Sequence, residues 1–311
     1  MKQTKLLLLM TVFSLAFAKL YAAETEPNNT KAAANTLAFG GSNTGAINVS
    51  GDEDWWAVTT TADGKLNITI TVSNGLTTRC QIYDNDGIAL LESDYTSTTK
   101  VISEDGLTAG TYYLKVNAFT TGQLPVYTIS NTLTEPAEAN DNEPNNSRAD
   151  AKTLNLNSST TGHVNYYYNL QRDSSDWYKV TTNADGRLRL TLTSGNGQTV
   201  RAYLYDNNGT TLLDDGYTSS TGAVVNKDGL AVGTYYVKII AFTTSSGYIP
   251  YTLADSLFTP AQGNDIEPNN SRADAITLGL NNSKTGHVNY YYDLQRDSSD
   301  WYKVTTNADG R

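Results

Sequence analysis

The chain has 311 residues and a formal net charge of −10, from 22 Lys and Arg against 32 Asp and Glu. Such an acidic chain is unsuited to nucleic acid or to an anionic membrane surface, and it attracts cations. The single Cys excludes an intrachain disulfide framework and any multi-Cys metal site. Only 17% of the residues are charged and 21 are Tyr, which favours a β-rich extracellular protein over a helical or disordered one.

The N-terminus has the pattern of a secretory signal peptide. Lys2 and Lys5 precede an apolar run, Leu6 to Ala18, that ends in Ala-Phe-Ala. This predicts a signal peptide over residues 1–18, cleaved after Ala18 or after Ala23. The run is too short for a membrane anchor, which needs about 20 apolar residues. We therefore expect a secreted or bacterial cell-surface protein without membrane insertion.

The rest of the chain is one unit repeated. Glu-Pro-Asn-Asn begins at residues 26, 143 and 267, and each occurrence is followed by Asp-Trp-Trp or Asp-Trp-Tyr. A repeat of domain size indicates separate domains in tandem. The predicted units are residues 24–131, 141–255 and 265–311, joined by linkers near 131–141 and 255–265. The third copy stops before most of its expected strands, so we expect the natural protein to continue beyond Arg311.

Strand patterns dominate each copy. Leu66 to Val72 alternates apolar and polar residues, as does Leu188 to Thr193 in the second copy. Asp-Asn-Asp-Gly at 84–87 lies between two apolar runs and predicts a hairpin turn. Ala-rich stretches at 30–37 and 147–154 each predict one short helical turn. Short strands with frequent turns predict an all-β protein of tandem antiparallel sandwiches, the last one truncated.

Each copy opens with a cluster of acidic and Asn residues. The pattern is Glu or Asp, any residue, then Glu-Pro-Asn-Asn, and it begins at residues 24, 141 and 265. Alternate residues of an extended segment point to the same side, so the two acids converge. An Asp-x-x-Asp pair at 173 and 176, and again at 297 and 300, can complete a shell of oxygen ligands for a hard cation such as Ca²⁺. The alternative is a polar linker with solvated acids.

These motifs, followed by Tyr-Asp-Asn-x-Gly and Gly-Thr-Tyr-Tyr-x-Lys, resemble the bacterial pre-peptidase C-terminal domain family. That family includes the collagen-binding domains of clostridial collagenases. The resemblance covers nearly all of residues 24–311. It implies a jelly-roll-like β-sandwich, secretion, and non-catalytic attachment to other domains, often peptidases.

The resemblance also implies a calcium site in each copy, because the collagen-binding members hold calcium with the corresponding residues. Gly51 stands where copy one should have the first Asp of Asp-x-x-Asp, and Asp52 is a possible substitute. An Asn replaces the family's fourth acidic ligand in every copy, which removes a charge and should weaken binding. The implied ligands are Asp141, Glu143, Asn145, Asn146, Asp173 and Asp176; Asp265, Glu267, Asn269, Asn270, Asp297 and Asp300; and Glu24, Glu26, Asn28, Asn29 and Asp54.

Copies two and three carry a Tyr-rich insertion that copy one lacks. Tyr166, Tyr167 and Tyr168 are repeated as Tyr-Tyr-Tyr at 290–292. Three consecutive side chains cannot all face one core, so we expect at least one to reach solvent and contact a sugar or an extended peptide. The alternative, which we favour, is ordinary packing with a hydrogen-bonded Tyr at the rim of the sandwich.

Catalytic signals are weak. His163 and His287 occupy one repeat position that Ala46 fills in copy one, and we expect a solvent-facing His there. Cys80 aligns with Ala202 and is expected to be a small core residue. The sequence contains no Gly-x-Ser-x-Gly, His-Glu-x-x-His or phosphate-loop motif. We expect no catalytic residue in this chain.

Three functions remain open. The first is a secreted string of calcium-stabilised modules for binding, spacing or adhesion, with a collagen-like protein or a polysaccharide as partner. The second is a set of accessory domains of a secreted hydrolase, such as a peptidase, whose catalytic part lies outside residues 1–311. The third is a surface stalk without a ligand.

Overall fold

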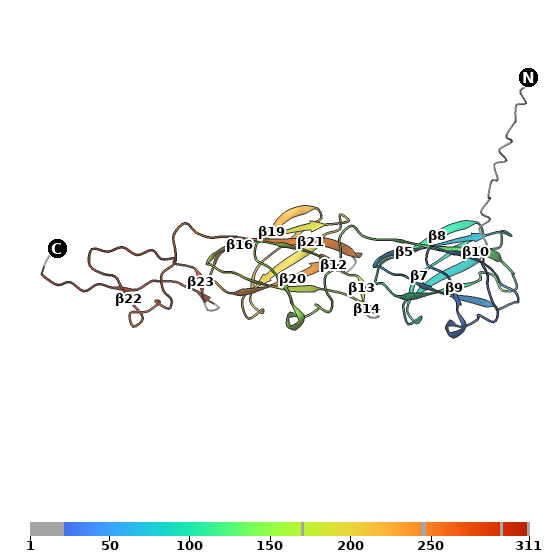
Figure 1. The fold of residues 1–311 in the computed structure, drawn as a ribbon, viewed down its shortest axis with the longest axis horizontal. Coiled ribbons are helices and arrows are strands. Elements are labelled where there is room, and N and C mark those ends of the chain that lie inside the picture. Colours follow the sequence, from blue (N-terminus) through green and yellow to red (C-terminus); the bar gives the residue numbers. More distant parts are fainter. Residues whose placement is uncertain (1–21, 169–170, 244–246, 293–294, 310–311) are drawn as a thin grey trace, which may run out of the picture.

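The structure is a computed structural model that describes residues 22–168, 171–243, 247–292 and 295–309. The predicted signal peptide lies outside these residues. The first two repeats are β-sandwiches placed end to end, and the third extends beyond them (Figure 1). The other elements in the described ranges are two 3-10 turns, Lys31–Ala33 and Arg148–Asp150, which lie within the two predicted helical turns. The all-β prediction is confirmed. Among the described residues, no helix has the length and apolar content to cross a bilayer.

Repeat 1 consists of two facing sheets, with strand orders β1-β3-β10-β5-β8 and β2-β4-β9-β6-β7. Most neighbours pair antiparallel, as predicted, but the two-residue edge strands β1 and β2 pair parallel to β3 and β4. The strands are β1 Ala22–Ala23, β2 Asn35–Thr36, β3 Ser42–Ala46, β4 Glu53–Thr59, β5 Gly64–Val72, β6 Thr78–Tyr83, β7 Leu90–Thr96, β8 Thr99–Leu107, β9 Thr111–Ala118 and β10 Val126–Thr134.

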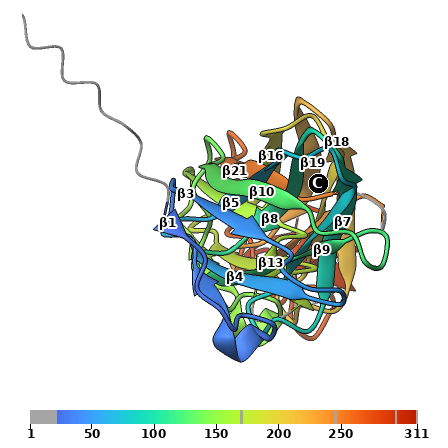
Figure 2. The same ribbon diagram turned by 90° about the vertical axis from the view of Figure 1, so that its right-hand side faces the viewer.

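Repeat 2 has the same two sheets, β12-β21-β16-β19 and β11-β15-β20-β17-β18. Viewed end-on, the repeats lie one behind another along the long axis (Figure 2). The strands are β11 Lys152–Leu154, β12 Ser159–Val164, β15 Asp176–Thr181, β16 Gly186–Ser194, β17 Val200–Tyr205, β18 Leu212–Thr218, β19 Thr221–Leu230, β20 Thr234–Ala241 and β21 Ile249–Phe258.

Four short strands join one repeat to the next. β13 (Tyr167–Tyr168) and β14 (Gln171–Arg172) belong to repeat 2 in sequence but extend the β8 edge of the first sheet of repeat 1. β23 (Tyr291–Tyr292) and β24 (Gln295–Arg296) of repeat 3 extend the β19 edge of repeat 2 in the same way. Repeat 3 also has β22 (Ile276–Thr277) paired with β25 (Tyr302–Lys303).

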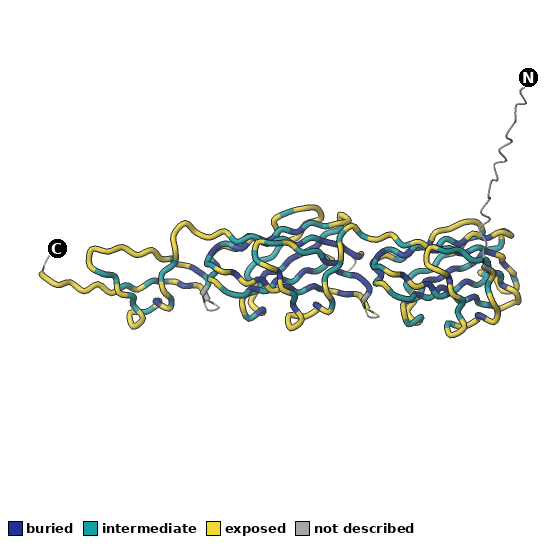
Figure 3. The backbone as a smooth tube through the Cα atoms, in the orientation of Figure 1, coloured by how far each residue is buried: buried dark blue, intermediate teal, exposed yellow. Residues whose placement is uncertain are grey.

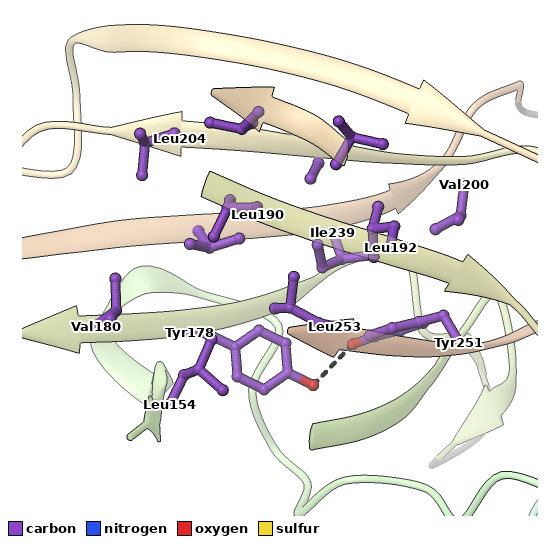
Figure 4. Packing of buried hydrophobic residues seen from close by; sticks show 14 of the residues in the cluster. Leu154, Tyr178, Val180, Leu190, Leu192, Val200, Leu204, Ile239, Tyr251 and Leu253 are labelled. Carbon is purple, nitrogen blue, oxygen red and sulfur yellow. Dashed lines mark hydrogen bonds between the residues drawn. The ribbon is translucent and has the colours of Figure 1, made fainter. Parts of the chain in front are cut away.

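The predicted alternation of apolar and polar residues places the apolar side chains in the core. In β5, Leu66, Ile68 and Ile70 are buried while the residues between them are more exposed. Cys80 is 1% exposed and lies in the core of repeat 1, as predicted. Repeat 2 packs Leu190 and its neighbours in the same arrangement (Figure 4). The buried positions lie inside the two sandwiches, whereas repeat 3 is largely exposed (Figure 3).

The sandwiches extend past their predicted ends, because β10 continues to Thr134 and β21 to Phe258. The predicted linkers began at polar residues that the structure buries. Asn131 is 2% exposed, accepts a hydrogen bond from Gly40 N at 2.9 Å and donates one to Ala38 O at 2.9 Å. Asp255 accepts from the backbone of Asn157 and Ser158, each at 3.0 Å. These bonds satisfy the polar groups, so the strands continue through them.

Candidate metal centre

The opening segment of repeat 2 is tied to the start of β15. The Glu143–Pro144 peptide is cis, and Glu143 Oε2 accepts a hydrogen bond from Asn145 N at 3.1 Å. Asn145 O in turn accepts from Trp177 N at 2.9 Å. This places the acidic opening segment beside Asp176, the first residue of β15. The same contacts recur in repeat 3, where Trp301 N donates to Asn269 O at 2.9 Å.

In each repeat, three carboxylates separated in sequence come together. One oxygen from each member of a group lies within 4.8 Å of the others. The first two members come from the opening segment and the third stands before the Trp. The groups are Glu24, Glu26 and Asp54; Asp141, Glu143 and Asp176; and Asp265, Glu267 and Asp300.

The strongest sign of a cation site is a set of buried oxygens without a hydrogen-bond partner. In repeat 2, five predicted ligand residues each contribute one such atom. Repeat 3 contributes the same five atoms. They are Asp141 Oδ1, Glu143 Oε1, Asn145 Oδ1, Asp173 Oδ2 and Asp176 Oδ1, with Asp265 Oδ1, Glu267 Oε1, Asn269 Oδ1, Asp297 Oδ2 and Asp300 Oδ1 in repeat 3. Because a buried oxygen without a partner is costly, this donor set fits a hard cation.

Two tyrosines hold the remaining oxygens of the carboxylates in repeat 2. The Tyr178 hydroxyl donates to Asp141 Oδ2, and the Tyr251 hydroxyl donates to Asp176 Oδ2. The two hydroxyl oxygens are 2.7 Å apart (Figure 4). Gly162 provides the space for them, because a Cβ there would lie 2.5 Å from the Tyr251 oxygen. Each Tyr orients its carboxylate so that the other oxygen stays available to a cation.

Burial raises the pKa of these carboxyl groups. Desolvation raises the pKa of Asp141 to about 6 and that of Glu143 to about 7, and Lys152 offsets the effect only in part. The pKa of Asp176 is well above its usual range because of burial and the charges of Asp141 and Asp173. Such shifts arise where carboxylates share a site without enough positive charge, which a bound cation would supply.

The two Asn residues of the motif face different partners. Asn145 is fully buried and leaves Oδ1 without a partner beside the carboxylates. In its hydrogen-bonded orientation, the Asn146 amide instead donates to Ser175 O at 2.9 Å and to the Asp173 carboxylate. The geometry therefore leaves Asn145 Oδ1 available to a cation, whereas the Asn146 amide supports Asp173. Asn269 and Asn270 divide in the same way.

In repeat 1, hydrogen-bond donors of the protein satisfy more of the oxygens of the site than in repeat 2. Asp52, the suggested substitute for the Asp missing at Gly51, is 5% exposed and accepts from Asn48 N at 2.7 Å. Glu26 Oε1 accepts from Asn48 Nδ2 at 3.2 Å. Asn28, suitably oriented, accepts from Asn35 Nδ2 at 2.9 Å. Burial raises the pKa of Asp54 to about 8. We expect this site to bind a cation more weakly than the site of repeat 2.

The structure corrects two predictions about aromatic and His residues. Tyr166 and Tyr167 are 2% and 7% exposed, so they pack at the junction between repeats and are not open to an external ligand. The side chain of Tyr168 lies outside the described set. His163 is 1% exposed, not solvent-facing, because its ring bonds to Glu138 O at 2.6 Å.

Two of the tyrosines that hold the carboxylates belong to no motif in the sequence. Tyr127 of repeat 1 and Tyr251 of repeat 2 are both buried and both donate to the Asp that precedes the Trp. They lie in the last long strand of each repeat, far in sequence from that Asp. The one sequence signal for these tyrosines was that they occupy the same position in the two copies.

Comparisons with known proteins give only distant matches. The sequence matches no protein-family model and no curated protein. Among solved structures, it is similar to the pre-peptidase C-terminal domain of collagenase from Bacillus anthracis, with 15% identity, a TM-score of 0.29, and coverage of 32% of this chain and 94% of that one. It is also similar to the CBM22-1-CBM22-2 tandem domain of Paenibacillus barcinonensis Xyn10C, with 9% identity, a TM-score of 0.21, and coverage of 65% and 82%. These likenesses are too distant to assign a ligand or an activity.

Proposed function

We propose that this chain is a secreted string of calcium-stabilised β-sandwich modules. The modules attach to a collagen-like protein or a polysaccharide, or they act as a spacer that holds other domains away from it. The observation that carries the calcium site is the set of five buried, unpartnered oxygens, present in the same residues of repeats 2 and 3. Asp141, Glu143, Asn145, Asp173 and Asp176 would hold the ion in repeat 2.

The donor chemistry favours calcium over other common metals. All five atoms are carboxylate or amide oxygens, and Ca²⁺ takes six to eight oxygen ligands in flexible geometry. Zinc prefers His nitrogen and Cys sulfur, and the acidic groups identified among the described residues contain neither. Magnesium usually keeps several of its waters and uses only one or two carboxylates. A buried cluster of four carboxylates and one amide in repeat 2 suits the larger ion.

The calcium proposal is tested by isothermal titration of the full chain. The Glu143→Gln change removes a charged ligand, so we expect the number of calcium ions bound per chain to fall by one. Glu135→Gln makes the same chemical change at an exposed residue and should leave the number unchanged. Absence of binding at millimolar calcium in the unmodified chain would refute the site.

The attachment role predicts binding without turnover. The full chain should bind immobilised collagen or a polysaccharide, and it should not hydrolyse casein, gelatin, glycans or esters. Tandem copies gain avidity when linked modules bind together, which suits attachment. If the chain is retained neither on collagen nor on the polysaccharide, a ligand-free stalk is favoured. Hydrolysis abolished by a single substitution would show that the chain is an enzyme.

A second candidate function follows from the motif resemblance stated above, because that family is often attached to peptidases. In that case these repeats are accessory domains of a secreted hydrolase. The full-length open reading frame decides between the two, since a catalytic motif outside residues 1–311 would favour the hydrolase.

A further inference from the structure

The Tyr-rich insertion of repeat 2 forms a closed hairpin. Asn165 N donates to Asp173 O at 2.7 Å, and Asp173 N donates to Tyr166 O at 2.6 Å. Within the hairpin, β13 and β14 pair antiparallel, with Tyr167 opposite Arg172. We call residues 165–168 and 171–173 the Tyr hairpin. It projects from the end of repeat 2 that faces repeat 1 (Figure 1).

The Tyr hairpin completes repeat 1. Tyr167 pairs with Leu107 as a parallel neighbour of β8, and its ring belongs to the hydrophobic core of repeat 1. Its hydroxyl donates to Asp84 Oδ2 at 3.1 Å, and Asp84 is only 2% exposed. Asp84 begins the predicted hairpin turn of repeat 1. A residue of one repeat therefore fills the core and satisfies a buried carboxylate of the repeat before it.

Two further contacts surround the hairpin. His163 and Tyr248 of repeat 2 lie at 5.2 Å between ring centroids, and Tyr248 packs against Gly106 of repeat 1. Gly106 has φ +69°, and a Cβ there would lie 2.6 Å from the Tyr248 side chain, so this approach requires glycine. Arg172 forms an ion pair with Glu104 of repeat 1.

The second junction repeats the strand pairing and the core packing of the tyrosine. Tyr291 pairs with Leu230 of β19, accepts a hydrogen bond at its carbonyl from Ala231 N at 3.0 Å, and packs against the core of repeat 2. Lys227 stands at the position of Glu104 and lines this junction together with Asp228 and with Arg296, the counterpart of Arg172. The strand pairing and core contact of the tyrosine are thus common to both junctions, and among the described residues the ion pair occurs only at the first.

Repeat 1 has no Tyr hairpin. Asn48 is followed directly by Val49, Ser50 and Gly51 before Asp52, whose amide donates to Val49 O at 3.2 Å. Repeat 1 is also the unit that no other repeat precedes in this sequence. The hairpin therefore occurs in the two copies that have a preceding repeat to receive it.

We propose that the Tyr hairpin is a docking element whose partner is the β8 or β19 end of the preceding repeat, and that this contact holds successive repeats as a stiff rod. Repeat 1 can receive a hairpin but has none to offer. Backbone pairing to a sheet edge fixes direction, and a buried aromatic anchor fixes position. The contacts with repeat 1 come from Tyr167 and Arg172, neither of which is a proposed calcium ligand, although the last residue of the hairpin, Asp173, is one. The joint extends the proposed spacing role.

The stiffness is tested in the full chain by double electron–electron resonance. Spin labels are attached at Thr98→Cys and Ser220→Cys, two exposed turn positions, in a Cys80→Ala background. Ala already occupies the matching core position, Ala202. We expect one narrow distance distribution, and a several-fold broader one in Tyr167→Ala. Tyr217→Ala removes a 59% exposed Tyr from repeat 2 and should keep the narrow distribution.

Hydrogen exchange supplies the second measurement. Tyr167→Ala should speed exchange in β8 of repeat 1 and leave β16 of repeat 2 unchanged, although the substitution lies in repeat 2. Replacing residues 166–172 by the shorter Val-Ser-Gly segment of repeat 1 should have the same effect. A broad distribution in the unmodified chain would overturn the proposal. Unchanged distances in both variants, or faster exchange in β16, would overturn it as well.

Discussion

An Asp176→Asn variant is expected to make repeat 2 more stable than the unmodified chain without calcium and less stable with it. Asp176 is fully buried, and its charge is opposed by those of Asp141 and Asp173. Replacing it by a neutral amide removes this repulsion when no cation is present. With calcium, the same change removes a ligand. The effect of one substitution therefore reverses its sign.

The expected magnitudes make the reversal measurable. A ligand that binds only the native state, at 100 times its dissociation constant, stabilises by about 2.7 kcal/mol, and the variant should lose most of this. In the absence of calcium, relief of the buried charge is expected to contribute on the order of 1 kcal/mol in the other direction. The free energy of unfolding of repeat 2 is measured by hydrogen exchange of β16, with calcium and with chelator.

The matched control is Asp150→Asn, which makes the same change at an exposed residue of the same repeat. It should show the same calcium response as the unmodified chain. If Asp176→Asn destabilises repeat 2 equally with and without calcium, Asp176 has a structural role and the cation site is wrong.

Gly162→Ala is expected to destabilise repeat 2 by about 1–3 kcal/mol, as overpacking of a filled site does. The added Cβ would lie 2.5 Å from the Tyr251 hydroxyl oxygen and 2.9 Å from that of Tyr178. Both rings must then move, and they hold Asp176 and Asp141. We therefore also expect one calcium fewer per chain in isothermal titration.

Gly233→Ala is the control for this substitution, because a Cβ at Gly233 meets no atom within 4 Å. Its effect on the free energy of unfolding should stay within about 0.5 kcal/mol, and the calcium stoichiometry should not change. A Gly162→Ala chain that keeps full stability and full stoichiometry would show that the tyrosines do not position the ligands.

Local patterns in the sequence were sufficient for the strands and for the acidic clusters. The alternation in β5 and β16 predicts which residues enter the core, because side chains of a strand alternate between its faces. The Glu-x-Glu spacing predicts converging carboxylates for the same reason. The repeated motifs also predicted the order of the domains, because the motifs recur in the same order in successive copies.

Tertiary structure decided the features that depend on a distant partner. Asn131 and Asp255 are polar residues of the kind found in linkers. In the structure they lie buried within strands, and their side chains form hydrogen bonds with backbone groups far away in sequence. Three consecutive Tyr predict that at least one ring faces solvent, but they do not say which rings are covered. Tyr166 and Tyr167 are buried, because the open edge of the preceding sheet lies beside them. A sequence pattern records which face of a strand is apolar, but the partner that covers a sheet edge is determined only when the repeats pack together.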